Sequence, residues 1–143
     1  FSGEDGRTTI FDYWTVDSIR RWRNGGKFDG ALLTDEEKKL KDFYAQTLRL
    51  AVEEPAFSEG LFWDLMYVNG HLDRQFAFLR SDRIKTYLVV ANFSNESLST
   101  DIRIPADAIR ELAPDKVKNN LAHDITVSVK LKAWDGVVKK IKL

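Results

Sequence analysis

Hydrophobic residues follow two different periods along the chain, a helical one before Pro55 and a strand-like one after Leu61. Between Thr34 and Glu54, apolar side chains recur at the i, i+3, i+4 and i+7 spacing of one helix face. This spacing predicts an amphipathic helix with one buried stripe. The stripe consists of Leu40, Phe43, Tyr44, Thr47, Leu48 and Ala51.

Local signals mark both ends of this helix. Thr34 and Glu37 have the spacing of a capping box, in which the hydroxyl accepts a backbone N–H and the carboxylate reaches back to the cap. Pro55 cannot continue the helix, and it restricts Glu54 before it to an extended conformation. The predicted helix therefore spans residues 34–54.

The residues before this helix show neither period. Glycines interrupt the segment repeatedly, and a short helix is predicted only over Val16–Trp22. Its aromatic residues are Phe1, Phe11, Tyr13, Trp14 and Trp22. A loop this long and this aromatic is unusual in a compact domain, so we expect its rings to belong against a surface that lies outside this chain.

Three apolar segments predict the first strands. Leu61–Asn69 alternates loosely and is expected to be buried on both sides for part of its length. Gln75–Arg80 and Thr86–Phe93 are nearly continuous apolar runs, which are typical of central strands in a packed sheet.

The remaining strands alternate more strictly. Leu98–Ile104 and the segment from Ile125 to Lys132 each have one polar face, and Ala106–Leu112 is expected to form a short helical turn. Asp135-Gly136 is a two-residue hairpin signal that leads into a final strand, whose lysines protect a sheet edge. The pattern predicts a mainly β fold, an antiparallel Greek-key β-sandwich of about six to eight strands, preceded by an irregular segment and one long α-helix.

Composition narrows the function classes. The 143 residues include 22 basic and 22 acidic side chains, so net charge gives no indication of a nucleic-acid partner. Cysteine is absent, which excludes disulfides and thiolate metal sites. No apolar run approaches the ~20 residues of a membrane span, so no membrane insertion is expected.

Catalytic patterns are also weak. His71 and His123 lie far apart in predicted loops and are expected to be ordinary surface histidines, with no metal or cofactor. No serine lies in a G-x-S-x-G motif. Carboxylates gather at the two ends of the predicted helix, where they are expected to serve the helix dipole rather than an acid–base pair. The chain alone is therefore not expected to be an enzyme.

Tryptophans are the candidate sugar-binding residues, because saccharide faces stack on aromatic rings. Trp63 lies in a strand and is expected to pack in the core. Trp134 lies beside the Asp135-Gly136 turn and is the more exposed candidate, and Trp14 and Trp22 in the lead-in are others.

Several segments in order resemble the carboxy-terminal part of an α-amylase-type enzyme of glycoside hydrolase family 13. They are GEDGRTTIFDYW, NGGKFDGALLTDEEKKL, FYAQTLRLAVEEPAFSEGLF, FAFLR and LVVANFS. The resemblance implies that residues 1–56 are a remnant of the (β/α)8 catalytic barrel, namely the loop after its last strand and its final helix. Residues 57–143 would be the C-terminal β-sandwich domain.

The resemblance also implies a role. The family's catalytic carboxylates would precede Phe1, and none maps onto this sequence, while Ala122-His123-Asp124 resembles the family's N-H-D motif only by coincidence. A complete barrel takes roughly 250 residues, more than this whole chain. The chain would then be a non-catalytic domain that stabilises the barrel of an enzyme acting on α-glucans.

The alternative is a starch-binding module that uses exposed aromatic residues. Its candidate carbohydrate-binding residues are Trp134 and Trp14, together with Asp5 and Arg7 in the segment that resembles the active-site rim of the barrel. The expected partners are the barrel, an α-glucan and, through the Thr34–Glu54 helix, a second copy of the chain. A periplasmic or extracellular parent enzyme fits the resemblance, and a cytoplasmic one fits the sequence equally well.

Overall fold

The computed structural model describes residues 16–117 and 122–142. The chain divides into two compact units, Phe1–Arg49 and Leu50–Leu143. Each unit is described by itself. In the part of the chain that the structure covers, no helix is both long enough and apolar enough to cross a bilayer.

The first unit contains α1 (Asp17–Arg23), a short 3-10 turn, η2 (Asn24–Gly26), and α2 (Asp35–Glu53) up to Arg49. The predicted capping box is confirmed, because the Glu37 N–H donates to Thr34 Oγ1 and the Thr34 N–H donates to Glu37 Oε2. Glu37 also accepts from the Arg21 guanidinium at 2.6 and 2.9 Å, so one carboxylate joins α1 to the start of α2.

The apolar stripe of α2 does not lie where the spacing predicted. No residue of α2 is buried. Leu40, Phe43, Tyr44 and Leu48 are each more than half exposed, with Leu48 at 61%. The stripe has the spacing of a buried face, but none of residues 16–49 of the first unit covers it.

The second unit is a β-sandwich with short helices at its ends. Its strands are β1 (Leu61–Asp64), β2 (Gln75–Ser81), β3 (Thr86–Asn92), β4 (Leu98–Ile104), β5 (Ile125–Leu131) and β6 (Gly136–Ile141). Its helices are α3 (Pro55–Ser58) and α4 (Ala106–Leu112), with 3-10 turns η3 (Met66–Val68) and η4 (Pro114–Lys116).

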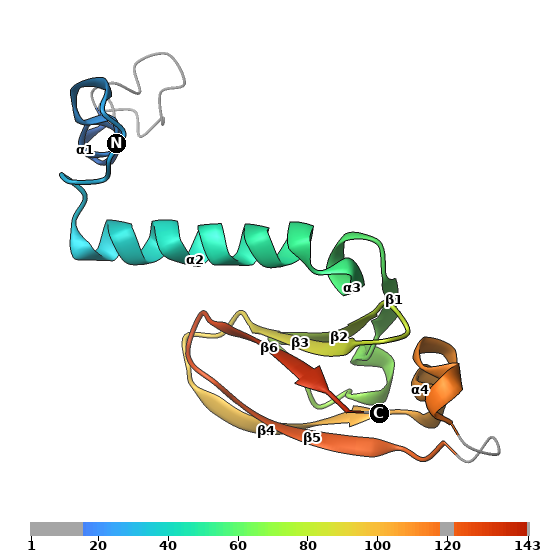
Figure 1. The fold of residues 1–143 in the computed structure, drawn as a ribbon. Coiled ribbons are helices and arrows are strands. Elements are labelled where there is room, and N and C mark those ends of the chain that lie inside the picture. Colours follow the sequence, from blue (N-terminus) through green and yellow to red (C-terminus); the bar gives the residue numbers. More distant parts are fainter. Residues whose placement is uncertain (1–15, 118–121, 143) are drawn as a thin grey trace. The chain divides into compact units, whose positions relative to one another are not determined.

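The strands form two antiparallel sheets that face each other (Figure 1). The larger has the order β1-β2-β3-β6, and the smaller pairs β4 with β5. The chain leaves β3 for the smaller sheet and returns as β6 beside β3, which is a Greek-key connection. The predicted fold class is confirmed.

The core lies between the sheets and extends under α4. The larger sheet contributes Ala77, Leu79, Leu88 and Val90, the smaller Ile102, Ile104, Val129 and Leu131, and α4 Ala108, Ile109 and Leu112. These strand residues alternate along the sequence, so one side of each strand faces the core. Trp63, predicted to pack in the core, lies partly buried against it.

The first strand is shorter than the alternation predicted. β1 ends at Asp64, and the chain turns into η3 where a strand was expected up to Asn69. The cause is local, because Asp64 Oδ1 accepts the Met66 N–H at 2.7 Å and closes a turn. The expected burial on both sides is also wrong, since only Trp63 in β1 is as much as partly buried.

The two central strands are central as predicted, but only one of their faces is fully buried. Burial alternates strictly along β2 and β3, so their outward side chains are half-exposed. The chain after α2 crosses part of this outer face. Arg80 donates to the backbone carbonyls of Ala56 and Phe57 and thereby fixes α3 to β2.

The other predicted elements agree with the structure. α1, α2, β4, α4 and β5 lie within two residues of the predicted bounds. β6 is an edge strand of the larger sheet, so Lys139 and Lys140 have the edge position that was expected for them. Helix α3 was not predicted, although Pro55 occupies its first turn, a position that proline favours.

Candidate functional site

Three features of the second unit could serve a function: a crevice beside α3, the outer face of the larger sheet, and a hollow among the loops at one end of the sandwich.

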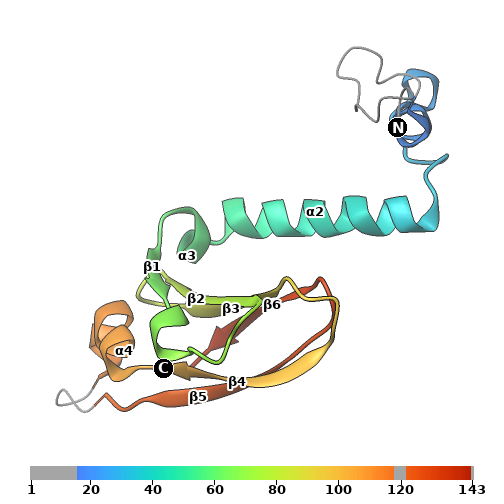
Figure 2. The same cartoon turned by 180° about the vertical axis from the view of Figure 1, so that it is seen from behind.

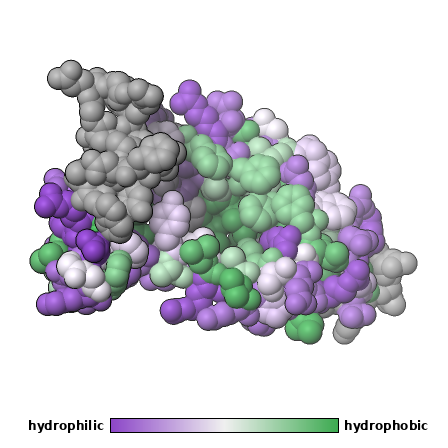
Figure 3. Space-filling model, turned by 90° about the horizontal axis from the view of Figure 1, so that it is seen from above, coloured by the Kyte–Doolittle hydropathy of each residue, from purple (hydrophilic) through white to green (hydrophobic). Residues whose placement is uncertain are grey.

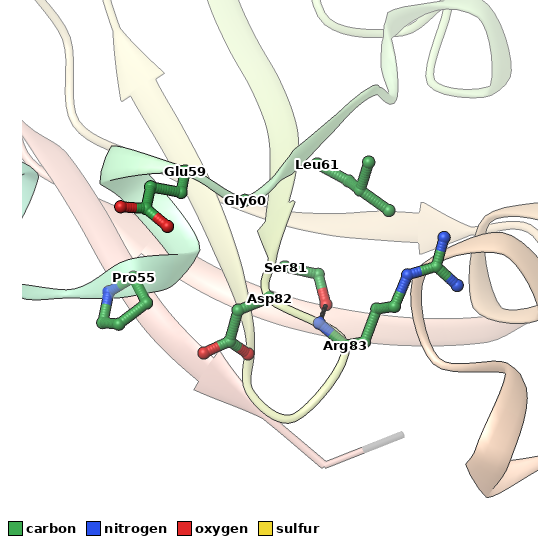
Figure 4. Close-up of a pocket in the computed structure, with 7 residues that line it drawn as sticks. All are labelled: Pro55, Glu59, Gly60, Leu61, Ser81, Asp82 and Arg83. Atoms are coloured by element: carbon green, nitrogen blue, oxygen red, sulfur yellow. Dashed lines mark hydrogen bonds between the residues drawn. The ribbon is translucent and has the colours of Figure 1, made fainter.

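The crevice has a volume of about 310 Å³. It is lined by Pro55, Glu59, Gly60, Leu61, Ser81, Asp82 and Arg83 (Figure 4). Gly60 forms part of its wall, because a Cβ there would lie 2.3 Å from the carbonyl oxygen of Ala56. The backbones of the α3–β1 connection and of the β2 end therefore approach each other more closely than any side chain permits.

The charged side chains of Asp82 and Arg83 in this crevice contact other groups of the protein. Asp82 accepts the backbone N–H groups of Lys85 and Ile84, and these hydrogen bonds hold its pKa below the ordinary range. Arg83 extends away from the two carboxylates, and its Nη2 lies 4.0 Å from Glu111 Oε1 (Figure 4). A glycosidase acid needs a raised pKa, so Asp82 is unsuited to that role.

A charged network holds Glu54, the residue before Pro55 in this crevice. Glu54 accepts from Lys85 Nζ at 3.0 and 3.1 Å and from the Tyr87 hydroxyl at 2.9 Å. The hydrogen bond from Lys85 lowers the pKa of Glu54, while burial raises the pKa of Tyr87. Phe57 packs on Tyr87 with ring centroids 5.3 Å apart. Together these contacts fix α3 over one end of the larger sheet.

The rest of the outer face of this sheet is apolar and open. Phe78 lies between Phe62 and Phe76, with ring centroids 5.4 and 5.6 Å apart. Val89 and Val138 are paired across β3 and β6 and share this face. We call these five residues the phenylalanine face. Phe62 is 51% exposed and Val138 45%. Hydrophobic side chains gather on the side of the molecule seen in Figure 3.

The hollow lies between the segment before β2 and the β3–β4 connection. The β5–β6 turn lies beside that connection, at the end of the sandwich away from α4 (Figure 2). The volume of the hollow is about 370 Å³. The lining is predominantly polar and consists of His71, Asp73, Arg74, Gln75, Ser94, Asn95 and Glu96. We call it the loop-end hollow.

The predicted site residues fall in different places. Trp134 lies in the β5–β6 turn at this same end and is 70% exposed, and its N–H donates to the Ser94 carbonyl. Trp14, Asp5 and Arg7 lie outside the described residues. Trp22, in the first unit, packs edge-on against Phe28.

The two histidines lie apart on the surface of the second unit. His71 and His123 are both exposed, and His71 Nε2 lies 3.1 Å from Thr100 Oγ1. Within residues 16–117 and 122–142, no cluster of three or more histidine and carboxylate side chains could hold a metal ion. Asp124, in the Ala122-His123-Asp124 segment, binds Arg103 and accepts the Ala106 N–H, which is a structural role.

No protein-family model matches the chain, and no curated protein matches it either. The resemblance to glycoside hydrolase family 13 therefore stays a prediction.

Sequence reasoning did not identify the phenylalanine face or the loop-end hollow. A signal for the first was present, because Phe76 and Phe78 are two residues apart in one strand and must share a face. The hollow had no such signal, since its lining comes from segments about twenty residues apart in the sequence.

Proposed function

We propose that this chain is a non-catalytic part of an α-amylase-type glycoside hydrolase acting on α-glucans, in which the β-sandwich covers and stabilises the catalytic barrel. The observation that carries the proposal is the phenylalanine face, an apolar surface on a sheet whose other side is already packed. The resemblance of the sequence supplies the identity of the partner.

The composition of the sheet surface supports docking on a protein. Central strands β2 and β3 give the apolar middle, and the edge strands place Asp64 and Lys140 at its margins, as the registers with Phe78 and Tyr87 require. Protein interfaces commonly have this apolar centre and polar rim. Each Å² of apolar surface covered would contribute roughly 25 cal/mol, so a few half-exposed phenylalanines contribute substantially.

The roles of two carboxylates at the crevice agree with a supporting domain. Asp82 is held charged by backbone N–H groups, and Glu54 is held charged by Lys85 and Tyr87. Both carboxylates stabilise the fold, so neither is free to act as a proton donor at neutral pH.

The test uses the full-length enzyme that the proposal requires. The triple variant F62T/F76T/V138T should lower the temperature at which that enzyme loses activity on maltoheptaose, because the covered apolar area is lost. The same substitutions should change the melting temperature of the 143-residue chain by much less, since all three side chains are exposed. The variant T126S/S128T, on the polar outer face of β5, is the matched control.

Two results would overturn the proposal. One is that the chain by itself releases sugar from maltoheptaose. The other is that the coding sequence upstream of Phe1 contains no (β/α)8 barrel, whose last strands and carboxylates the resemblance requires.

Carbohydrate binding is the second candidate, and one observation favours it: Trp134 is 70% exposed and its backbone N–H donates to Ser94, which lines the polar hollow. Exposed aromatic residues next to hydrogen-bonding groups are typical of sugar-binding surfaces. Retardation of the chain in a gel that contains amylose or glycogen, abolished by Trp134→Ala, would support this candidate. The two roles use different surfaces of the sandwich and can be tested separately.

A further inference from the structure

We infer that the loop-end hollow and the adjacent Trp134 form a preorganised binding site for a short segment of a neutral oligosaccharide. The location of the site rests on the structure, whereas the choice of an α-glucan as its ligand rests on the proposed function.

The lining of the hollow fits a neutral polyhydroxylated ligand. Asp73 and Glu96 can accept hydrogen bonds, Arg74 can donate them, and the amides of Gln75 and Asn95 can do both. Acidic and basic groups are mixed, so neither an anion nor a cation is favoured by the local charge. Sugar hydroxyls, which donate and accept at once, match this mixture.

The loops around the hollow are held in one arrangement by a buried amide. Asn92 is only 3% exposed. Its Nδ2 donates to the carbonyls of Glu96 and Lys132, both at 2.8 Å. Its Oδ1 accepts from Gln75 Nε2 at 2.9 Å and from the Ser94 N–H at 3.1 Å. One side chain at the end of β3 therefore ties together the start of β2, the β3–β4 connection and the residue after β5.

Backbone hydrogen bonds complete this arrangement. The Phe93 N–H donates to the Arg74 carbonyl at 2.8 Å, and the Asn92 N–H donates to the Asp135 carbonyl at 2.8 Å. The Trp134 N–H donates to the Ser94 carbonyl at 3.0 Å. Since Arg74 and Ser94 both line the hollow, the two aromatic residues are fixed to its walls through their backbones. Less ordering entropy is then lost when a ligand binds.

Trp134 has a backbone conformation that its side chain disfavours. Its φ is 53°, in the left-handed region, where glycine is at ease and a bulky residue is strained. The indole ring of this strained residue does not pack in the core, because Trp134 is 70% exposed. Phe93, on the neighbouring loop, is 60% exposed. Strain retained at an exposed aromatic residue indicates that the ring serves a ligand rather than the fold.

If Trp134 strains the backbone but binds a ligand, its replacement should keep or raise the stability of the chain and weaken ligand binding. Trp134→Gly removes the ring and also relieves the backbone, so its melting temperature should equal or exceed that of the unmodified chain. Binding of maltoheptaose to the 143-residue chain, measured by isothermal titration, should weaken at least about tenfold in the same variant. Glu96→Gln should weaken binding less, and Phe93→Ala should weaken it several-fold.

The matched control is Trp22→Ala, which removes a tryptophan that is 46% exposed in the other unit and should leave the binding constant unchanged. Trp134→Asn, which also tolerates a positive φ, repeats the test if the glycine variant alters the turn.

The outcomes separate this inference from the proposed function. Binding of cellohexaose instead of maltoheptaose, lost in Trp134→Gly, would support the site and contradict an α-glucan parent enzyme. Failure of both sugars to bind the unmodified chain would overturn the site and leave the phenylalanine face untouched. Binding that survives Trp134→Gly would also overturn it.

Discussion

Asn69 is the single side chain on which the edge of the smaller sheet depends. It is fully buried, and its amide donates to the carbonyls of Leu65 and Arg103 at 2.8 and 2.9 Å. Its carbonyl oxygen accepts the Arg103 N–H at 2.8 Å. The side chain thus makes with β4 the pair of hydrogen bonds that a neighbouring strand would make.

Replacing Asn69 by alanine should be costly for this reason. The variant removes the partner of the Arg103 N–H and C=O groups and one of the two hydrogen bonds to the Leu65 carbonyl, which costs about 2–3 kcal/mol of unfolding free energy. Urea unfolding of the chain measures this change. Asn95→Ala, at an exposed position, is the control and should change the free energy of unfolding by less than about 0.5 kcal/mol. Equal effects in the two variants would contradict the role given to Asn69.

Residues of this kind were beyond sequence reasoning. Asn69 and Asn92 were predicted only as residues at or near the ends of strands, because their partners at Arg103 and Lys132 lie 34 and 40 residues away. Trp134 could be predicted as exposed because its neighbour is a local hairpin signal. The strained φ of Trp134 could not be predicted from that signal.

Among the elements, α2 is the one whose start is most clearly fixed by side-chain contacts. Glu37 accepts from Arg21 and from the Thr34 N–H, and these contacts lower the pKa of Glu37 to about 2. A carboxylate whose pKa is lower in the folded state stabilises that state when it is charged. The contribution is complete above the ordinary pKa of 4.5 and is lost as the pH falls toward 2.

Acidification should therefore loosen the junction of α1 and α2 between about pH 4.5 and pH 2. A carboxyl titration of Glu37 by NMR should give a midpoint near 2, and helical circular dichroism should decline over the same range. Glu37→Gln removes the titrating group, so its helix signal should be weaker at neutral pH and should change less on acidification. A midpoint near 4.5 for Glu37 would show that the Arg21 contact does not form.

Elements with local signals could be predicted and those set by distant contacts could not. The capping box needs only Thr34 and Glu37, and the alternation of β4 needs only its own residues. β1 was predicted too long because apolar residues continue after Asp64, while the turn that ends the strand depends on one carboxylate. The α2 stripe was predicted to be buried but is exposed. The spacing identifies an apolar helix face, and it does not show whether another segment packs against that face.

For the whole molecule, the exposed stripe of α2 makes self-association the expected behaviour. Four large apolar side chains on one helix face favour contact with a second copy of the chain. Phe43→Ser combined with Leu48→Ser should shift the chain toward monomer in sedimentation velocity. Lys39→Ser combined with Gln46→Ser, at exposed polar positions of the same helix, is the control. A chain that is monomeric at every concentration before any substitution would contradict this expectation.

At this scale the fold class was predictable, because turn signals and alternation recur at the spacing of a sandwich. The surfaces that could serve a function were less predictable from the sequence. The loop-end hollow depends on the register of β2 with β3, which places the residues before β2 beside those after β3, and that register is a property of the sheet rather than of either segment.

The strict alternation of β2 carries a consequence for how the sequence of this domain can change. Even-numbered positions such as Phe76 and Phe78 face outward, and odd-numbered ones such as Ala77 and Leu79 face inward. Neighbouring positions are therefore selected for different properties. The outward residue is selected for its contacts at the surface, and the inward residue for its packing in the core. A lineage could drift to a new binding partner by substituting every second residue while its interior stayed intact.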